Sequence, residues 1–186
     1  MTAEDYPDGS TFRRIVDEAQ LHAAVQRIAE GIARDYPHGY PLVVVALLKG
    51  AVVFLADLVR RLTMPLEIEL VSARSYSGTQ RGPVVAVQDD LSRLGLAGRH
   101  VLLLDCVLDS GHTLHSVLRS VLSCEPASVR TCVLLRKQRE RAVSIEPEYV
   151  GADVPDVFLV GYGLDYKNLW RHLPYVAELP PGLAGE

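Results

Sequence analysis

One segment constrains the fold of this chain more than any other. It is an apolar run that ends on acidic residues and continues through a short turn into a helix. Residues 101–113 read VLLLDCVLDSGHT, and a helical pattern follows from Leu114 to Leu122. The first N–H groups of a helix lack intrahelical partners and carry the positive end of the helix dipole. The segment therefore predicts a phosphate-binding turn at the end of a buried strand. The carboxylates beside it suit a sugar hydroxyl, a hydrated Mg²⁺ or a proton transfer.

Apolar runs and helical patterns alternate along the rest of the chain. Asp17 and Gln20 form a capping-box-like pair before an amphipathic helix with Leu21, Val25 and Ile28 on one face. A second helix is expected over residues 51–62. The expected strands cover residues 42–48, 66–73, 84–87, 100–104, 129–135 and part of 156–161. This alternation predicts an α/β fold with a mostly parallel sheet flanked by helices.

Length and charge narrow the class of protein. The 186 residues fit one domain over residues 1–186, with residues 1–10 as a loose N-terminal arm. The net charge of −4 disfavours a nucleic-acid partner, and no apolar run is long enough for a membrane span. The first residues lack an apolar signal core. The cysteines are odd in number and show no C-x-x-C spacing, which favours a reduced, cytoplasmic compartment.

Polar clusters follow the ends of several expected strands. In parallel α/β sheets the working residues gather beyond the carboxyl ends of the strands. The sequence therefore predicts that these clusters converge in space. They are Lys49-Gly50, residues 105–113, Arg136-Lys137, and Asp165 with Arg171.

Six segments in order resemble the purine phosphoribosyltransferases of the hypoxanthine-guanine type. They are Leu47–Gly50, Ser75-Tyr76, Asp89–Leu91, Asp105–Thr113, Leu134–Lys137, and Phe158–Tyr166 with Arg171. The resemblance spans roughly residues 43–176. It implies a type I phosphoribosyltransferase fold with a small hood formed by the terminal segments. The implied reaction is purine salvage: Mg²⁺-dependent transfer of 5-phosphoribosyl from phosphoribosyl pyrophosphate to hypoxanthine or guanine. A homodimer or homotetramer is the implied assembly.

The resemblance also implies where the phosphates and the reacting proton go. Asp109 is the implied acid/base carboxylate beside the imidazole nitrogens of the purine. The ribose 5-phosphate is expected on the turn formed by Ser110, Gly111, His112 and Thr113. The pyrophosphate is expected at Lys49, Gly50 and Arg171, where the peptide before the lysine is often cis in the family. The plainer interpretations are a helix capped by Asp109 or Ser110, a solvated Lys49, and an Asp165–Arg171 surface salt bridge.

The purine and the metal have implied partners as well. Lys137 would donate to the 6-oxo group, which favours a 6-oxopurine over adenine. Phe158 would stack on the base, or belong to the core, and the backbone of Leu159 would meet the purine edge. The implied Mg²⁺ carboxylates are Asp165 and Asp105, and Asp105 also binds the ribose hydroxyls. Ser75 and Tyr76 would begin a lid over residues 75–83. Arg139 and Arg141 are expected to be solvated.

At Cys106 the sequence departs from the family pattern. The family has two adjacent acids where this chain has Asp105 and Cys106, and a thiol is a poor partner for Mg²⁺. Either Cys106 marks a damaged ribose and metal position, or its side chain turns into the core and Asp105 acts alone. A catalytically weak homologue that binds a nucleotide or phosphoribosyl pyrophosphate as a sensor is therefore the competing function. An RNA-binding regulator of the same fold is disfavoured by the acidic balance.

Overall fold

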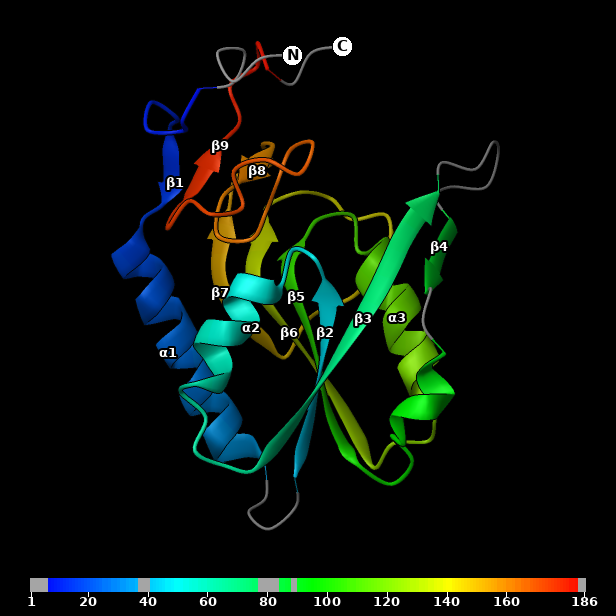
Figure 1. The fold of residues 1–186 in the computed structure, drawn as a ribbon. Coiled ribbons are helices and arrows are strands. Elements are labelled where there is room, and N and C mark those ends of the chain that lie inside the picture. The colour runs from blue at the N-terminus through cyan, green and yellow to red at the C-terminus, as the bar shows by residue number, and fades with distance from the viewer. Residues whose placement is uncertain (1–6, 37–40, 77–83, 88–89, 184–186) are drawn as a thin grey trace.

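A parallel sheet between helices forms the body of the protein (Figure 1). The computed structural model describes residues 7–36, 41–76, 84–87 and 90–183, with backbone alone at 74–76 and 84–87. The elements are β1 (Arg14–Val16), α1 (Glu18–Asp35), β2 (Leu42–Leu48), α2 (Val52–Val59), β3 (Leu66–Tyr76), β4 (Val84–Val87), the short 3₁₀ helix η2 (Leu91–Leu94), β5 (His100–Leu108), α3 (His112–Leu122), β6 (Ser128–Lys137), β7 (Tyr149–Val154), β8 (Leu159–Val160) and β9 (Val176–Glu178).

The large sheet has the strand order β4-β3-β2-β5-β6-β7. The five strands β3, β2, β5, β6 and β7 pair in parallel with their neighbours. The edge strand β4 pairs antiparallel with β3. Ala46 in the central strand β2 pairs with Leu70 on one side and Leu104 on the other. The mostly parallel α/β fold predicted from the sequence is confirmed.

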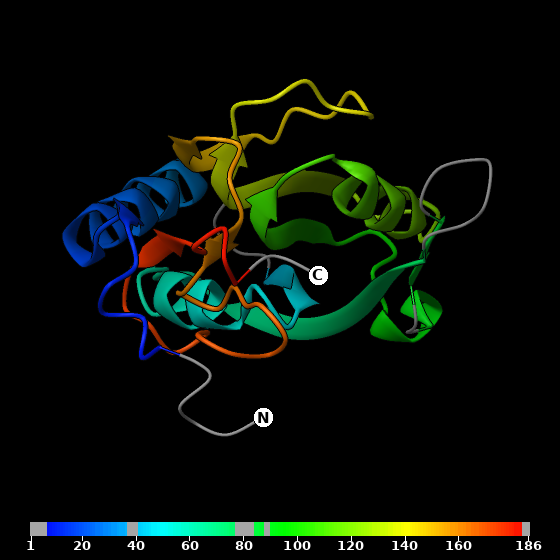
Figure 2. The same cartoon turned by 90° about the horizontal axis from the view of Figure 1, so that it is seen from above.

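Helices α1 and α2 lie on one side of the sheet and α3 lies on the other (Figure 2). The central strand β2 is apolar at every position because both of its faces are covered. Val44 and Ala46 point toward α1 and α2, whereas Val43 and Val45 point toward α3. This double cover fixes the strands, and with them the position of the loops at their carboxyl ends.

Several element boundaries differ from the sequence prediction. Helix α1 starts as predicted, with Asp17 as N-cap and a reciprocal capping box with Gln20. Helix α3, however, begins at His112 rather than Leu114, directly after the turn. Strand β3 extends to Tyr76, so Ser75 and Tyr76 belong to a strand and not to a loop. The antiparallel partner β4 accounts for this extension, since it pairs with β3 at residues 73–76.

A second, small sheet forms a hood from the terminal segments, as the resemblance implied. Its strand order is β1-β9-β8, and it lies at the end of the large sheet where the parallel strands finish (Figure 1). Within the expected N-terminal arm, the carbonyl of Pro7 accepts from Trp170 Nε1 at 2.9 Å and the carbonyl of Gly9 from the Tyr175 hydroxyl at 3.1 Å. These bonds hold the described end of the arm against the hood.

No described helix combines the length and the apolar character that crossing a membrane requires.

Candidate active site

Two adjoining cavities lie at the carboxyl ends of the parallel strands, beneath the hood. One has a volume of about 270 Å³ and the other about 260 Å³. Both are bordered by Gly50, Val107, Asp109 and Leu164. The first extends toward Lys49, Lys137, Phe158, Leu159, Asp165 and Arg171, and the second toward Asp105, Ser110, Gly111 and Thr113. The fold therefore brings together the polar clusters that the sequence places at separate strand ends.

The turn between β5 and α3 is shaped by its glycine. Gly111 has a φ of +86°, and a Cβ there would lie 3.0 Å from the carbonyl oxygen of Val143 and 3.1 Å from Ile145 Cγ2. No side chain caps α3, so the capping role considered for Asp109 or Ser110 is not present. The first N–H groups of α3 remain available for an anion. Ser110 and Thr113 line the cavity here, whereas His112 opens the helix and is outside the lining.

Asp109 lies at the junction of the two cavities and is held by two cations. Lys137 Nζ donates to Asp109 Oδ2 at 2.7 Å, and Arg139 donates to Oδ1 at 2.9 Å. Asp156 accepts from Arg139 at 3.4 Å and lies 3.7 Å from Lys137 Nζ. Lys137 is 9% exposed, so it is the buried member of this group. Arg139 is solvent-exposed as expected, with 39% of its side chain accessible, and it is also an ion-pair partner of Asp109.

Asp156 was missed by the sequence analysis as a member of this cluster. It follows β7, a strand that the sequence did not predict because Gly151 and Asp153 interrupt its apolar pattern. Because the strand that positions Asp156 is not visible in the sequence pattern, no local signal could have identified this residue.

Lys49 and Gly50 form another part of the lining of the first cavity. The Leu48–Lys49 peptide bond is cis. A Cβ on Gly163, whose φ is +96°, would lie 2.3 Å from the carbonyl oxygen of Gly50. The segment leading to Arg171 therefore packs directly on the Lys49-Gly50 loop, an approach that only glycine permits at this position.

Asp165 and Arg171 form an ion pair at the rim of the same cavity. Arg171 Nη2 lies 2.6 Å from Asp165 Oδ1, and Arg171 Nη1 donates to the carbonyl of Gly163 at 2.7 Å. The backbone N–H of Asn168 donates to Asp165 Oδ2 at 2.7 Å. The salt bridge considered from the sequence exists, and both of its partners also line the cavity.

Phe158 and Leu159 border the region between Lys137 and Arg171. Phe158 is 47% exposed, which rules out the core interpretation, and its ring meets Tyr166 edge-on at 5.6 Å. Leu159 is buried in β8 and pairs with Glu178 of β9. An aromatic face and a strand edge therefore lie where a planar ring could bind.

Asp105 and Cys106 point to opposite sides of β5, as neighbours in a strand do. Asp105 lines the second cavity, and burial raises the pKa of its carboxyl to about 7 although the N–H groups of Cys106 and Val107 donate to it. Cys106 is fully buried in the apolar core, with its Sγ 3.8 Å from the carbonyl oxygen of Tyr162. Its side chain is thus turned into the core, and Asp105 alone faces the cavity.

Only part of the expected lid and of the Asp89–Leu91 segment lies within the described residues. The backbone of Ser75 and Tyr76 ends β3, and the rest of the expected lid, residues 77–83, lies outside the described residues. Asp89 also lies outside them, and Asp90 caps η2.

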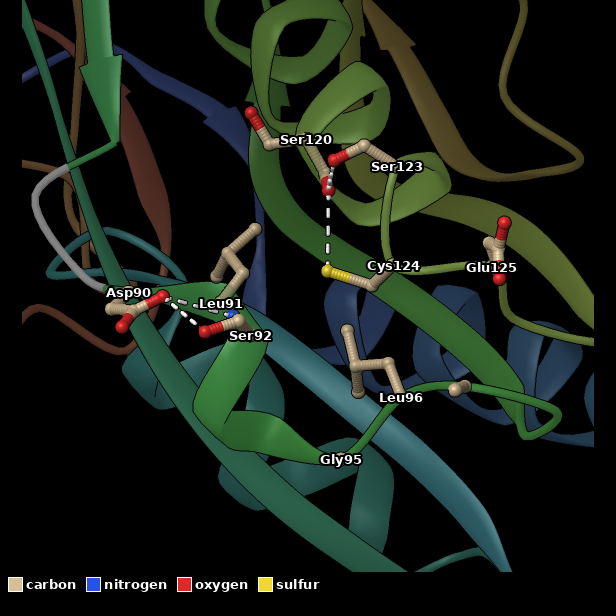
Figure 3. A pocket seen from close by; sticks show the side chains of 10 residues that line it. Asp90, Leu91, Ser92, Gly95, Leu96, Ser120, Ser123, Cys124 and Glu125 are labelled. Carbon is tan, nitrogen blue, oxygen red and sulfur yellow. Dashed lines mark hydrogen bonds between the residues drawn. The ribbon is translucent and has the colours of Figure 1, made fainter.

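A larger cavity, about 570 Å³, lies elsewhere, between η2 and the end of α3 (Figure 3). None of the predicted site residues that the structure describes lines it. Its polar groups bond to one another, as when Ser92 donates to Asp90 and Cys124 to the Ser120 carbonyl. It therefore offers no comparable convergence of charges and free backbone donors.

In this protein a buried strand leads through a glycine turn into the start of a helix, and a hood lies above that turn. This arrangement is the one expected of a phosphoribosyltransferase. Residues 13–167 match the family described as the phosphoribosyl transferase domain. The hypoxanthine-guanine phosphoribosyltransferase of Mycobacterium tuberculosis is 39% identical over 186 residues, covering 97% of this chain and 91% of that protein. The Escherichia coli hypoxanthine phosphoribosyltransferase is 37% identical, covering 91% and 96%. The chain belongs to the hypoxanthine-guanine phosphoribosyltransferase family.

Solved structures agree with this assignment. A Staphylococcus aureus hypoxanthine phosphoribosyltransferase superposes with a TM-score of 0.87 at 33% identity, covering 94% of this chain and 95% of that chain. The Trypanosoma cruzi hypoxanthine phosphoribosyltransferase in complex with the product IMP gives 0.85 at 32% identity, covering 96% and 100%.

Proposed function

We propose that this protein transfers 5-phosphoribosyl from phosphoribosyl pyrophosphate to a 6-oxopurine, hypoxanthine or guanine, and so serves purine salvage. The observation that carries the proposal is the junction of two cavities at Asp109. One cavity holds the helix start and hydroxyls suited to a 5-phosphate. The other offers Lys137 and Phe158 for a base and Lys49 and Arg171 for a diphosphate.

In the proposed reaction a bond forms between a purine nitrogen and C1′ of the ribose. The bond from C1′ to the pyrophosphate oxygen breaks, and pyrophosphate leaves with the electron pair. The proton of the imidazole ring passes to the carboxylate of Asp109. Lys49, Arg171 and nearby N–H groups stabilise the charge that develops on the leaving group. Lys137 leaves its contact with Asp109 and donates to the 6-oxo group.

The residues present fit a Mg²⁺ ion, which we include in the proposal. Mg²⁺ prefers hard oxygen ligands and is usually held by one or two carboxylates together with substrate oxygens and water. Asp105 and Asp165 supply such carboxylates, one on each cavity. The described residues hold no cluster of three or more His, Cys, Asp or Glu side chains of the kind that forms an all-protein metal cage. The ion would neutralise charge on the pyrophosphate.

The proposal extends to a cytoplasmic homodimer or homotetramer. Ile68 and Leu70 on β3 are 44% and 48% exposed, which suits a surface covered by a second copy. The three cysteines are free thiols, in keeping with a reducing compartment. Sedimentation of the purified protein measures the assembly directly.

A pyrophosphate-release assay with hypoxanthine, guanine and xanthine tests the function. The matched control is Asp109→Asn, which keeps the size of the side chain and should lower turnover by roughly 10²–10⁴-fold. If the variant turned over within a few-fold of the unaltered protein, Asp109 would not be the proton acceptor. Tight binding of phosphoribosyl pyrophosphate or IMP without any turnover would favour the sensor function instead.

A further inference from the structure

We infer that Arg139 is a positioning residue for the proton transfer: it holds one oxygen of Asp109 so that the other faces the purine. The inference rests on the proposed function, in which Asp109 accepts the proton. Its physical basis is the pair of cations that hold the two carboxylate oxygens separately, Lys137 on Oδ2 and Arg139 on Oδ1.

The two cations have different tasks once a purine binds. Lys137 is needed at the 6-oxo group of the base, and its departure frees Asp109 Oδ2. Arg139 then remains as the cation that the structure places in direct contact with this carboxylate. With Oδ1 held, rotation of the carboxylate is restricted, and Oδ2 stays directed toward the space that Lys137 has left.

The backbone around Arg139 is well placed to hold this position. Gln138 N donates to the carbonyl of Val154 at 2.8 Å, and Arg139 N donates to that of Lys137 at 3.1 Å. The first bond ties the turn after β6 to the end of β7, and the second closes the turn itself. Asp156, just beyond β7, accepts from the Arg139 guanidinium at 3.4 Å. The guanidinium, on a side chain that is 39% exposed, thus contacts two carboxylates, those of Asp109 and Asp156.

The same segment also supports the phosphate turn. Arg141 donates to the Ile145 carbonyl at 3.4 Å, and the carbonyl of Val143 lies against Gly111. The segment after β6 thus contacts Asp109 and the turn that follows it. Other charged groups that border the same cavities are Lys49, Asp105, Asp165 and Arg171.

A double-mutant cycle on the whole 186-residue chain tests the inference. Arg139→Gln should lower kcat by about 10–100-fold, the cost of a misplaced catalytic group. The KM values for hypoxanthine and phosphoribosyl pyrophosphate should change little, and Arg139→Lys should restore part of kcat. In the Asp109→Asn background, Arg139→Gln should have almost no further effect, because a residue acting through Asp109 needs that carboxylate.

The matched control is Arg136→Gln, which removes a charge from the same segment. Arg136 pairs with Asp153 at 2.6 Å and with Glu146 at 3.1 Å, outside the Asp109 cluster. It should leave kcat within about two-fold, because neither Arg136 nor its two carboxylate partners line the two cavities at Asp109. Melting temperatures of all variants identify any loss of folding.

Three outcomes would overturn the inference. One is an unchanged kcat in Arg139→Gln. Another is an equal loss with and without Asp109. The last is a rise in kcat/KM, which would show that the arginine restrains Asp109 unproductively. If Asp109→Asn itself keeps full turnover, the acid/base role in the proposed function fails first.

Discussion

Replacing Asp105 by asparagine should make the ligand-free protein more stable relative to the unaltered chain at pH 8 than at pH 5. Burial raises the pKa of this carboxyl from 3.8 to about 7. The folded protein therefore keeps a proton that the unfolded chain has lost, and stability falls as pH rises between these values. At about 1.4 kcal/mol per pKa unit, the full penalty is about 4 kcal/mol, most of it incurred above pH 5. The amide of asparagine carries no charge and avoids this penalty.

Urea unfolding at pH 5 and pH 8, in buffer without divalent cations, measures the effect. The free energy of unfolding of Asp105→Asn, minus that of the unaltered protein, should be higher at pH 8 by about 2–3 kcal/mol. Asp153→Asn serves as control, because the hydrogen bond from Arg136 lowers the pKa of Asp153 and keeps it ionised at both pH values. Its difference should be the same at pH 5 and pH 8. An equally flat result for Asp105→Asn would refute the argument.

Two further substitutions test the base pocket and the family departure. Lys137→Ala should raise the KM for hypoxanthine by roughly 10–150-fold, which is the value of a hydrogen bond from a charged donor. The KM for phosphoribosyl pyrophosphate should rise much less. Equal effects on both KM values in steady-state assays would show that Lys137 does not contact the base. Cys106→Asp should lower the free energy of unfolding by several kcal/mol, because the new carboxylate would be buried in the core, whereas Cys106→Ala should cost less. A stable Cys106→Asp protein with higher kcat/KM in Mg²⁺ would instead identify a damaged metal position.

Local sequence determined the elements whose signals act over a few residues. Asp17 and Gln20 identify the start of α1 because their capping bonds are local. The apolar run of β2 identifies a strand covered on both faces. The turn at Gly111 follows from the same kind of signal, since a glycine between an apolar strand and a helical pattern allows positive φ.

Elements stabilised by distant partners were not visible in the same way. The hood strands β1 and β9 are short, and β7 carries Gly151 and Asp153, so no local pattern distinguishes them from loops. Their pairing supplies the backbone hydrogen bonds that define them as strands. The extension of β3 through Tyr76 likewise depends on its pairing with β4.

For the candidate site, too, the sequence determined some features and the tertiary structure determined others. The sequence determined which side chains are available, from Lys49 to Arg171, and the order of strands predicted that they meet at one edge of the sheet. Only the tertiary structure decided that Arg139 and Lys137 share the carboxylate of Asp109, and that Cys106 turns into the core while Asp105 faces the cavity. The physical reason is that ion-pair partners and the face a strand residue presents are set by packing between segments far apart in the chain.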